Sequence, residues 1–369
     1  MKSFDGLRLL LVGPLPPPAG GMANQTRQLA ELLRGEGAQV EVVQVNAPYR
    51  PAWAEKLKGV RALFRLVPYL YRLWQGAGRA DLVHVMANSG WSWHLFAAPA
   101  VWMAALRGVP VVVNYRGGEA GTFLDRAGAV VRFTMRRASL LVLPSGFLLE
   151  VFARHGMPGR IVPNIIDLTR FRPADPPQPP GTQPHLVVGR NLEALYGNDV
   201  ALRAFALVAA RFPAARLTLA GAGPEAPALE SLARQLGVSD RICFAGRLDR
   251  DQMAALYRDA HLMLNASRVD NMPNALLEAL ASGLPIVSTR AGGIPFIVKD
   301  HHTARLVPVD DHVAMAEAAI EVLEDNALRN ALIAAGLADV QRYQWTSVRD
   351  ELRAAYIQAG AGQQTDSRT

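Results

Sequence analysis

Short runs of apolar residues recur along the chain, separated by longer segments in which apolar residues repeat at helical spacing. In the first half these runs occupy residues 7–13, 39–45, 81–86, 110–115 and 139–145. A second set occupies residues 185–190, 215–221, 241–246, 261–267, 284–289 and 304–309. Uniformly apolar strands between helices of ten or more residues indicate parallel sheets covered by helices on both faces. The pattern predicts an α/β protein with two doubly wound, Rossmann-like parallel-sheet domains.

The break between the two sets is a proline-rich stretch, FRPADPPQPPGTQPH, at residues 171–185. Six prolines in fifteen residues without periodicity are typical of a linker. We therefore expect an N-terminal domain over residues 1–170, a linker over 171–184 and a C-terminal domain over 185–345. A terminal helix and polar tail follow over 346–369, and this helix could pack back on the first domain. The two domains are expected to face a central cleft.

Charge and cysteine content narrow the class of protein. Residues 1–170 hold 20 basic and 10 acidic side chains, whereas residues 171–369 hold 19 and 22, so the two domains differ in net charge. The single cysteine, Cys243, allows no internal disulfide and favours a reducing compartment. The first apolar run is too short for a signal peptide, and the run at 91–106 is too short to span a membrane. We interpret residues 91–106 as a buried helix and predict a cytoplasmic protein.

Residues 52–75, AWAEKLKGVRALFRLVPYLYRLWQ, combine a basic stripe with a broad apolar arc. At helical spacing Lys58, Arg61, Arg65 and Arg72 share one narrow face, and Pro68 is expected to kink the helix. Basic groups beside Phe, Tyr and Trp suit the surface of an anionic bilayer. The alternative is a domain helix with a buried apolar face and a solvated basic edge. A nucleic-acid surface fits less well because the basic groups are confined to one segment.

The stretch VDNMPNALLEALASGLPIVSTRAGGIPF, residues 269–296, carries the densest candidate chemistry. Pro273 is tolerated only in the first turn of a helix, and Gly283 is suited to end one. Asp270 then lies in the loop after a strand, and Glu278 projects from the second helical turn. An ionised carboxylate accepts two hydroxyl hydrogen bonds at once, which suits a sugar diol. The alternative makes Asp270 a capping acid and Glu278 a solvated helix residue.

Other strand-end loops add glycines and an arginine. The loop after 284–289 would turn the N–H groups of Gly293 and Ile294 toward a ligand, and Gly20-Gly21 precede a helix in the first domain. Arg190 ends the first strand of the second domain, where it could bind a diphosphate or form a surface ion pair. Residues 221–226, GAGPEA, match a dinucleotide pattern but follow the second strand, so a turn is expected there.

These residues together resemble the signature of glycosyltransferase family 4, the retaining nucleotide-sugar transferases of GT-B fold. The shared pattern is an acid, seven residues, then Glu-Ala-x-Ala-x-Gly-x-Pro and a later Gly-Gly. VPNIIDLTRFRP at 162–173, VGR at 188–190, AGAGPE at 220–225 and FAG at 244–246 resemble further landmarks in their usual order.

The resemblance implies a role for each matching residue. Glu278 would bind the ribose of the donor, Asp270 the transferred sugar and Arg190 the diphosphate. Backbone and polar groups would complete the donor site at Gly20, Gly21, Gly246, Arg247, Asn271, Asn274, Gly292, Gly293 and Ile294. The donor is expected to be a UDP or GDP sugar, with no other cofactor and no metal, because no carboxylate or His/Cys set has ligand spacing.

The acceptor is expected to bind at strand-end loops of the first domain, through His84 and Asn88 after one strand and Arg116, Gly117 and Glu119 after the next. Sugar transfer gathers charge on the leaving diphosphate, so Arg190, helix N-termini and amide groups would stabilise it. The resemblance implies retention of anomeric configuration by front-side attack.

Three positions depart from the family pattern. Asp270 stands where glutamate is commoner, Tyr196 and Asn198 stand where a lysine often follows the arginine, and Phe296 stands where glutamate is frequent. Arg190 would then carry more of the diphosphate charge. The sequence predicts a peripheral membrane glycosyltransferase acting on a glycan or lipid-linked acceptor, in bacterial surface polysaccharide synthesis by analogy. The alternatives are a non-catalytic sugar-nucleotide-binding partner of another transferase and a related epimerase or phosphorylase. No oligomeric state is predicted.

Overall fold

The computed structural model describes residues 3–17, 20–49, 53, 61–176 and 179–361. The chain forms two compact units: unit 1 comprises Met1–Ile165 and Trp345–Thr369, and unit 2 comprises Ile166–Gln344. Unit 1 therefore ends five residues before the boundary expected at residue 170. The backbone N–H of Ile166 donates to the carbonyl of Tyr343, and Phe171 is 1% exposed in the core of unit 2. The first part of the expected linker thus packs as part of unit 2.

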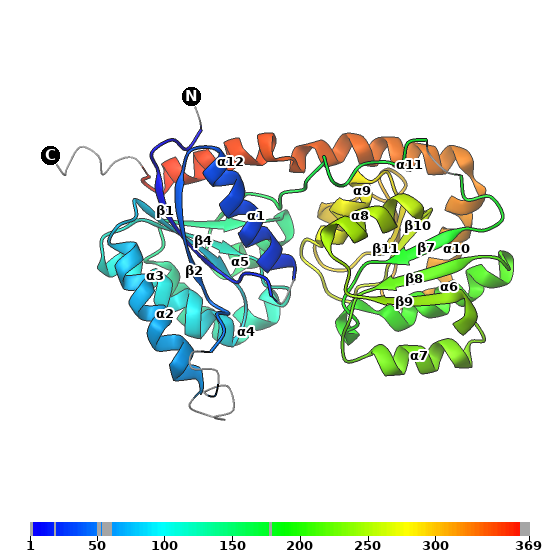
Figure 1. Cartoon of the computed structure of the whole chain (residues 1–369), viewed down its shortest axis with the longest axis horizontal. Coiled ribbons are helices and arrows are strands. Elements are labelled where there is room, and N and C mark those ends of the chain that lie inside the picture. The colour runs from blue at the N-terminus through cyan, green and yellow to red at the C-terminus, as the bar shows by residue number, and fades with distance from the viewer. Residues whose placement is uncertain (1–2, 18–19, 50–52, 54–60, 177–178, 362–369) are drawn as a thin grey trace. The chain divides into compact units, whose positions relative to one another are not determined.

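Unit 1 is built on a six-stranded parallel sheet in the order β2-β1-β3-β4-β5-β6 (Figure 1). Its strands are β1 Arg8–Gly13, β2 Gln39–Gln44, β3 Leu82–Ala87, β4 Val111–Tyr115, β5 Leu140–Leu143 and β6 Arg160–Ile161. The chain runs outward from β1 to β2, returns to β3 on the other side of β1, and continues to β6. This reversal places a topological switch point between β1 and β3, where loops at the carboxyl ends of strands can enclose a ligand.

Helices cover both faces of the unit 1 sheet. One face carries α2 Arg61–Ala77, α3 Ala98–Leu106, α4 Ala120–Met135 and α5 Gly146–Arg154, and the other carries α1 Gly21–Gly35 and α12 Trp345–Gln358. In β1, Leu10 and Val12 pack toward the first group, whereas Leu9 and Leu11 pack toward the second. Burial on both faces explains why the central strands β1, β3 and β4 have no polar alternation, whereas the partly exposed edge strand β2 alternates polar and apolar residues. The C-terminal helix α12 is thus part of unit 1.

Residues 91–106, expected to form a buried helix, fold as a short π-helix over Trp93–Ala97 followed by α3. Trp93 is fully buried, but Trp91 is 77% exposed and Leu106 is 71% exposed. The apolar run is therefore a helix with one buried side and exposed ends. No helix among the described residues is both long enough and apolar enough to cross a membrane.

Unit 2 has a second six-stranded parallel sheet, in the order β12-β11-β10-β7-β8-β9. Its strands are β7 His185–Val188, β8 Arg216–Ala220, β9 Ile242–Gly246, β10 Leu262–Asn265, β11 Ile286–Thr289 and β12 Arg305–Val307. Helices α6 Asn198–Arg211, α7 Ala226–Gln235 and α10 His312–Glu324 pack on one face, and α8 Arg250–Asp259 and α9 Asn274–Ala281 on the other. α11 Asn326–Asp339 follows α10. The prediction of two doubly wound parallel-sheet domains is confirmed.

Candidate active site

The switch point of unit 2 lies between β7 and β10, because β8 and β9 extend to one side of β7 and β10 to β12 to the other. Arg190 follows the carboxyl end of β7, and Asp270 lies in the loop after β10. The loop after β11 begins at Arg290. Ligands of doubly wound sheets bind outside the carboxyl ends of strands at such a point. The fold therefore brings the main sequence-predicted site residues together.

Arg190 and Asp270 form an ion pair between Nη2 and Oδ2, with side chains only 10% and 12% exposed. The guanidinium also stacks on the ring of Tyr196, 4.0 Å from its centroid. Among the described residues, Arg190 Nε has no hydrogen-bond partner. Because a guanidinium carries five N–H groups, Arg190 can donate further hydrogen bonds to an anion while it is paired with Asp270.

Asp270 is held from two directions. Its Oδ2 pairs with Arg190, and its Oδ1 accepts the backbone N–H of Asn271 at 2.9 Å. Burial raises the pKa of the Asp270 carboxyl, although Arg190 and the Asn271 N–H oppose the shift. α9 begins at Asn274 with Pro273 as its capping residue and has no side-chain cap. Asp270 is therefore not the capping acid of α9, and its carboxylate instead fixes the arginine of the neighbouring strand.

Glu278 is a partly buried acid near two arginines rather than a fully solvated helix residue. Burial raises the pKa of its carboxyl to about 7, against the opposing charges of Arg250 and Arg190 and the nearby hydroxyl of Tyr257. Burial, together with the nearby charge of Glu278, raises the pKa of the Tyr257 hydroxyl. A carboxyl with this pKa changes its charge near neutral pH. Its ionised form is the better acceptor for the hydrogen bonds of hydroxyl groups.

Tyr257 and Arg250, both on α8, were not among the residues predicted from the sequence. A Cβ at Gly189, next to Arg190, would lie 2.4 Å from the Tyr257 hydroxyl, so glycine at 189 allows the ring to approach β7. The helical pattern of residues 252–260 marks Tyr257 only as a core residue. Its place beside Glu278 depends on which faces of α8 and α9 meet.

The interpretation of the Gly292-Gly293 loop needs a correction. The N–H of Gly293 donates to the carbonyl of Asp270 at 2.8 Å, and the N–H of Ile294 donates to Ala291 at 3.0 Å. Neither is free for a ligand. A Cβ at Gly292 would lie 2.3 Å from the Asp270 carbonyl oxygen, and one at Gly293 would lie 2.0 Å from that of Asn271. These glycines therefore let the β11 loop pack backbone to backbone against the Asp270 loop.

The glycines of residues 221–223 have the same function. A Cβ at Gly221 would lie 2.0 Å from the carbonyl oxygen of Arg190, and one at Gly223 would lie 2.2 Å from that of Leu192. The resemblance of this loop to a dinucleotide motif thus has a packing explanation, in agreement with the turn expected there. The loop supports the backbone that carries Arg190.

The other predicted donor residues of unit 2 are spread more widely. Asn271 is 3% exposed beside Asp270, and Asn274 is the first residue of α9. Gly246 ends the edge strand β9 with a φ of +67°, and the exposed Arg247 follows it. β8 lies between β9 and β7, so Gly246 and Arg247 are not brought next to Arg190.

In unit 1 the predicted acceptor residues lie at the carboxyl ends of β3 and β4. Asn88 and Ser89 follow β3, and Arg116 and Gly117 follow β4. A Cβ at Gly117 would lie 2.3 Å from Ser89 Oγ, which shows how closely the two loops meet. Glu119 is exposed at the start of α4.

Gly20 and Gly21 begin α1 in the same unit and are exposed. No described atom lies within 4 Å of a Cβ built on Gly20. Unlike Gly292 and Gly293 of unit 2, Gly20 is therefore not required by close packing against a described loop. It directly precedes the amino end of the fifteen-residue helix α1.

His84 differs from the expectation that it would contact an acceptor. It lies inside β3 with no exposed surface, and its ring nitrogens meet the Tyr356 hydroxyl at 2.8 Å and Asn114 Nδ2 at 3.2 Å. Burial lowers the pKa of His84 to about 3, with a further contribution from the Arg116 charge. A neutral, enclosed histidine cannot reach a substrate, so His84 supports Asn114 instead.

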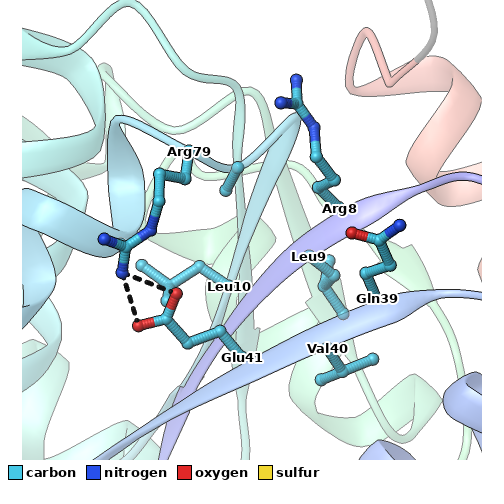
Figure 2. Close-up of a pocket in the computed structure, with 9 residues that line it drawn as sticks. Arg8, Leu9, Leu10, Gln39, Val40, Glu41 and Arg79 are labelled. Carbon is cyan, nitrogen blue, oxygen red and sulfur yellow. Dashed lines mark hydrogen bonds and ion pairs between the residues drawn. The ribbon is translucent and has the colours of Figure 1, made fainter.

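A pocket of about 510 Å³ lies at the opposite, amino-terminal edge of the unit 1 sheet (Figure 2). Its charged side chains are paired, Arg79 with Glu41 at 3.0 Å and Arg8 with Asp81. Because these charges satisfy one another, the pocket offers little to an ionic ligand. Among the residues that the structure describes, no group of three His, Cys, Asp or Glu side chains is placed to hold a metal ion.

Two parallel-sheet units, with an arginine and two acids gathered at the switch point of the second, define a two-domain glycosyltransferase of the GT-B fold. The family model "Glycosyl transferases group 1" matches residues 173–338, and "Glycosyltransferase Family 4" matches residues 19–170. The chain belongs to this family of glycosyltransferases.

One relative matches nearly the whole chain, and another matches a little more than half of it. A phosphatidyl-myo-inositol mannosyltransferase of Mycolicibacterium smegmatis is 27% identical over 373 residues, which cover 93% of this chain and 92% of that protein. A D-inositol 3-phosphate glycosyltransferase of Acidothermus cellulolyticus is 31% identical over 223 residues, 56% of this chain and 49% of that protein.

Solved structures share the fold at low identity. Sucrose-phosphate synthase from Thermosynechococcus elongatus superimposes with a TM-score of 0.74 at 19% identity, covering 95% of this chain and 98% of that one. Anabaena HepE in complex with UDP and glucose gives a TM-score of 0.70 at 16% identity, covering 94% and 98%. These similarities show that the whole chain has the GT-B fold.

Proposed function

We propose that the protein transfers a sugar from a UDP or GDP sugar to a glycan or lipid-linked acceptor, with retention of configuration. The observation that carries the proposal is the convergence of Arg190, Asp270 and Glu278 at the switch point of unit 2. Related proteins support it: one is named a phosphatidyl-myo-inositol mannosyltransferase, and the Anabaena structure holds UDP and glucose.

Each residue has a distinct task in this proposal. Arg190 neutralises the diphosphate, which gathers negative charge as the anomeric C–O bond breaks. Ionised Glu278 accepts hydrogen bonds from the ribose hydroxyls, and Asp270 contacts hydroxyls of the transferred sugar while orienting Arg190. Tyr196, which replaces the lysine common in the family, holds the guanidinium by stacking on it. In this proposal Arg190 binds the diphosphate without the second cation that the family often provides.

The donor and its site are tested by thermal unfolding with UDP, GDP and ADP. A ligand present at 100 times its dissociation constant adds about 2.7 kcal/mol to the stability. We expect one nucleotide to raise the melting temperature of the wild type and to lose most of this effect in Glu278→Ala. Glu230→Ala is the matched control, because Glu230 is exposed on α7 of the same unit. Stabilisation by none of the nucleotides would reject the proposal.

Retention and the absence of a metal requirement are tested on the reaction itself. We propose that Arg190 takes the place of a divalent cation, so activity should survive EDTA. Nuclear magnetic resonance of the product should show the anomeric configuration of the donor, and the inverted configuration would exclude front-side attack with retention.

A second candidate is a non-catalytic sugar-nucleotide-binding protein. It is favoured by Tyr196 in place of lysine and by Phe296, which is 42% exposed where the family often has glutamate. Slow donor hydrolysis without acceptor, measured as nucleotide release, separates the two. A transferase hydrolyses the donor and loses this activity in Arg190→Ala, whereas a binding protein only retains the nucleotide.

The membrane is the proposed location, on its cytoplasmic face, through α2 and its neighbours. Tyr69 and Leu73 of α2 are buried in the core, but Val67, Tyr71 and Trp74 are 61%, 63% and 40% exposed. The apolar arc predicted for residues 52–75 is therefore only partly used by the core. Lys58 lies outside the described residues, as does the side chain of Arg61.

The exposed apolar surface continues onto α3 and α4. Arg107 stacks on Trp74 at 4.2 Å, Arg137 stacks on Trp102 at 3.9 Å, and Phe133 is 54% exposed. Arginine beside exposed aromatic rings suits the interface of an anionic bilayer. We expect binding to vesicles that contain an anionic lipid, weaker binding for Trp74→Ser and no change for Trp345→Phe, a partly buried tryptophan on α12. If the wild type and Trp74→Ser bound anionic vesicles equally well, the proposal that this surface contacts the membrane would be wrong.

A further inference from the structure

Arg116, expected from the sequence to contact the acceptor, has an arrangement in unit 1 that indicates the chemical class of its ligand. Its Nε donates to Asn114 Oδ1 at 3.1 Å, and its Nη1 donates to Asn164 Oδ1. Both acceptors are neutral amide oxygens. No hydrogen bond of Nη2 to another described residue is recorded, and the side chain keeps partial exposure. One edge of the guanidinium is thus fixed by the protein, and the other remains available.

No acid of unit 1 balances this charge. Among the described residues no carboxylate forms an ion pair with Arg116, and the nearby Glu119 is exposed at the start of α4. Removal from water alone lowers the pKa of Arg116 to about 10. A cation taken out of water without an opposite charge is unfavourable unless a bound anion compensates it.

The orientation of Arg116 is fixed before any ligand arrives. Asn114 Nδ2 points at His84 Nε2, and His84 Nδ1 points at the hydroxyl of Tyr356 on α12. With His84 neutral, Nε2 accepts from Asn114, so Nδ1 carries the proton and donates to Tyr356. This assignment leaves Asn114 Oδ1 as the acceptor for Arg116. The chain of hydrogen bonds is a rigid support that brings no negative charge.

Small polar groups surround the loop that follows. Ser89 Oγ and the Tyr115 hydroxyl are 2.7 Å apart, and both lie within 2.8 Å of a Cβ built on Gly117. Glycine at 117 therefore lets hydroxyl groups approach the residue next to Arg116. Hydroxyl and guanidinium donors together are well suited to an oxyanion with several acceptor atoms.

We propose that Arg116 binds a phosphate or carboxylate group carried by the acceptor, so that the acceptor is an anionic substrate. This assignment rests on the proposed transferase function, since it assigns unit 1 to the acceptor. Arg116 is then a specificity residue: it distinguishes an anionic acceptor from a neutral sugar of the same size. His84, Asn114 and Tyr356 are positioning residues that act through it.

The test uses the full chain and small anionic probes. Thermal unfolding is followed with inorganic phosphate, sn-glycerol 3-phosphate and glucuronate, and with glycerol and glucose as neutral counterparts, at constant ionic strength. We expect an anionic probe to stabilise the wild type and its neutral counterpart to have no effect. In Arg116→Gln the apparent dissociation constant of that probe should rise about tenfold or more. Arg132→Gln is the matched control, because Arg132 is an exposed arginine of α4.

The outcomes separate the sources of the anion. Stabilisation by glycerol 3-phosphate and phosphate indicates a phosphate on the acceptor, whereas stabilisation by glucuronate alone indicates a carboxylate. No stabilisation by any anion, or an equal loss in Arg116→Gln and Arg132→Gln, overturns the proposal. A parallel loss of UDP or GDP affinity in Arg116→Gln also overturns it, since the anion would then be the donor diphosphate.

Stability without ligand provides an independent measurement. A purely structural arginine would make Arg116→Gln markedly less stable, whereas removal of an uncompensated charge should leave the stability equal or higher. Arg116→Lys keeps the charge but loses the planar fork, and weaker anion binding is expected. Unchanged anion binding in the lysine and glutamine variants would overturn the proposal.

The measurements distinguish failure of the proposed transferase function from failure of the anion site at Arg116. If no nucleotide binds but anions still depend on Arg116, the transferase function fails and an anion site remains. If a nucleotide binds through Glu278 and no anion depends on Arg116, only the present inference fails.

Discussion

Each unit places an arginine within two residues of the end of a buried strand, but the charges of the two arginines are balanced differently. Arg190 in unit 2 has the carboxylate of Asp270 and the ring of Tyr196 around it. Among the described residues, Arg116 in unit 1 donates to the amide oxygens of Asn114 and Asn164 and forms no ion pair. A cation paired within its own unit can be stable without ligand, whereas a cation surrounded by neutral acceptors is prepared for an anion from outside.

The glycines of the two units differ in what they pack against. In unit 2, a Cβ at Gly221, Gly292 or Gly293 would collide with the backbone of a neighbouring loop. In unit 1, a Cβ at Gly117, beside Arg116, would collide with side-chain atoms of Ser89 and Asn88, and no described atom lies within 4 Å of a Cβ at Gly20. Loops are therefore closely packed around both arginines, and the contrast in packing lies between the unit 2 glycines and Gly20 at the start of α1. Four predictions test this contrast, in decreasing order of expected effect.

The largest effect is expected from Arg190→Ala. The substitution leaves Asp270 buried without its cation, which should cost about 3 kcal/mol of unfolding free energy. Loss of a group that stabilises the leaving diphosphate should also lower kcat by about 10²-fold or more. Chemical denaturation and initial rates measure the two effects.

The double variant Arg190→Ala with Asp270→Asn serves as the control, since it removes both charges and should recover part of the stability. If Arg190→Ala and Arg116→Gln changed the stability equally, the contrast between a paired and an unpaired arginine would be wrong.

Gly293→Ala should be the next most damaging change. Its Cβ would lie 2.0 Å from the carbonyl oxygen of Asn271, so the loops must separate, at a cost of about 1–3 kcal/mol. Gly20→Ala is the matched control in unit 1, where no described atom lies within 4 Å of a Cβ and φ is −162°. Only the preference for glycine over alanine at a helix N-cap is lost there, about 0.5 kcal/mol. Equal melting temperatures for the two variants would contradict the packing difference.

The third prediction concerns pH. The pKa of the Glu278 carboxyl is raised to about 7, well above its ordinary value. The folded state therefore binds the proton more tightly than the unfolded chain, and this contribution to stability is lost as pH rises through 7. Nucleotide binding requires the ionised form, so its affinity should increase about tenfold between pH 6 and 8.

Glu278→Gln should abolish the pH dependence of affinity, as measured by calorimetric titration with the stabilising nucleotide. The variant should also lose less stability than the wild type between pH 5 and 8. An affinity that is flat with pH in the wild type would exclude Glu278 from the nucleotide site.

The smallest effect is expected at Tyr196. Tyr196→Ala removes the ring on which Arg190 stacks and should weaken nucleotide binding by about 1 kcal/mol. Tyr196→Phe keeps the ring and should bind as the wild type does, as measured by the same titration. If the phenylalanine variant lost as much affinity as the alanine variant, the hydroxyl rather than the stacking would matter.

The sequence by itself determined the two parallel sheets, and it indicated which residues to propose for the site. Uniformly apolar runs such as residues 9–12 can be satisfied only by strands covered on both faces, so the fold class followed from the pattern. Arg190, Asp270 and Glu278 could be named because parallel strands end at the same edge of a sheet, and the loops after them meet there. These inferences need only local spacing and the geometry of a parallel sheet.

Only the tertiary structure decided what each group contacts. The spacing of Gly292 and Gly293 indicates an unusual backbone, but whether their N–H groups face a ligand or the Asp270 loop depends on a loop from a different strand. The sequence around His84 does not indicate whether its side chain is exposed or buried. In the fold, Tyr356 of α12, from the far end of the chain, contacts the ring. Burial, hydrogen-bond partners and uncompensated charge are properties of residues brought together from distant positions. Only the fold therefore shows that Arg190 is paired with Asp270, whereas Arg116 is held by neutral amide oxygens.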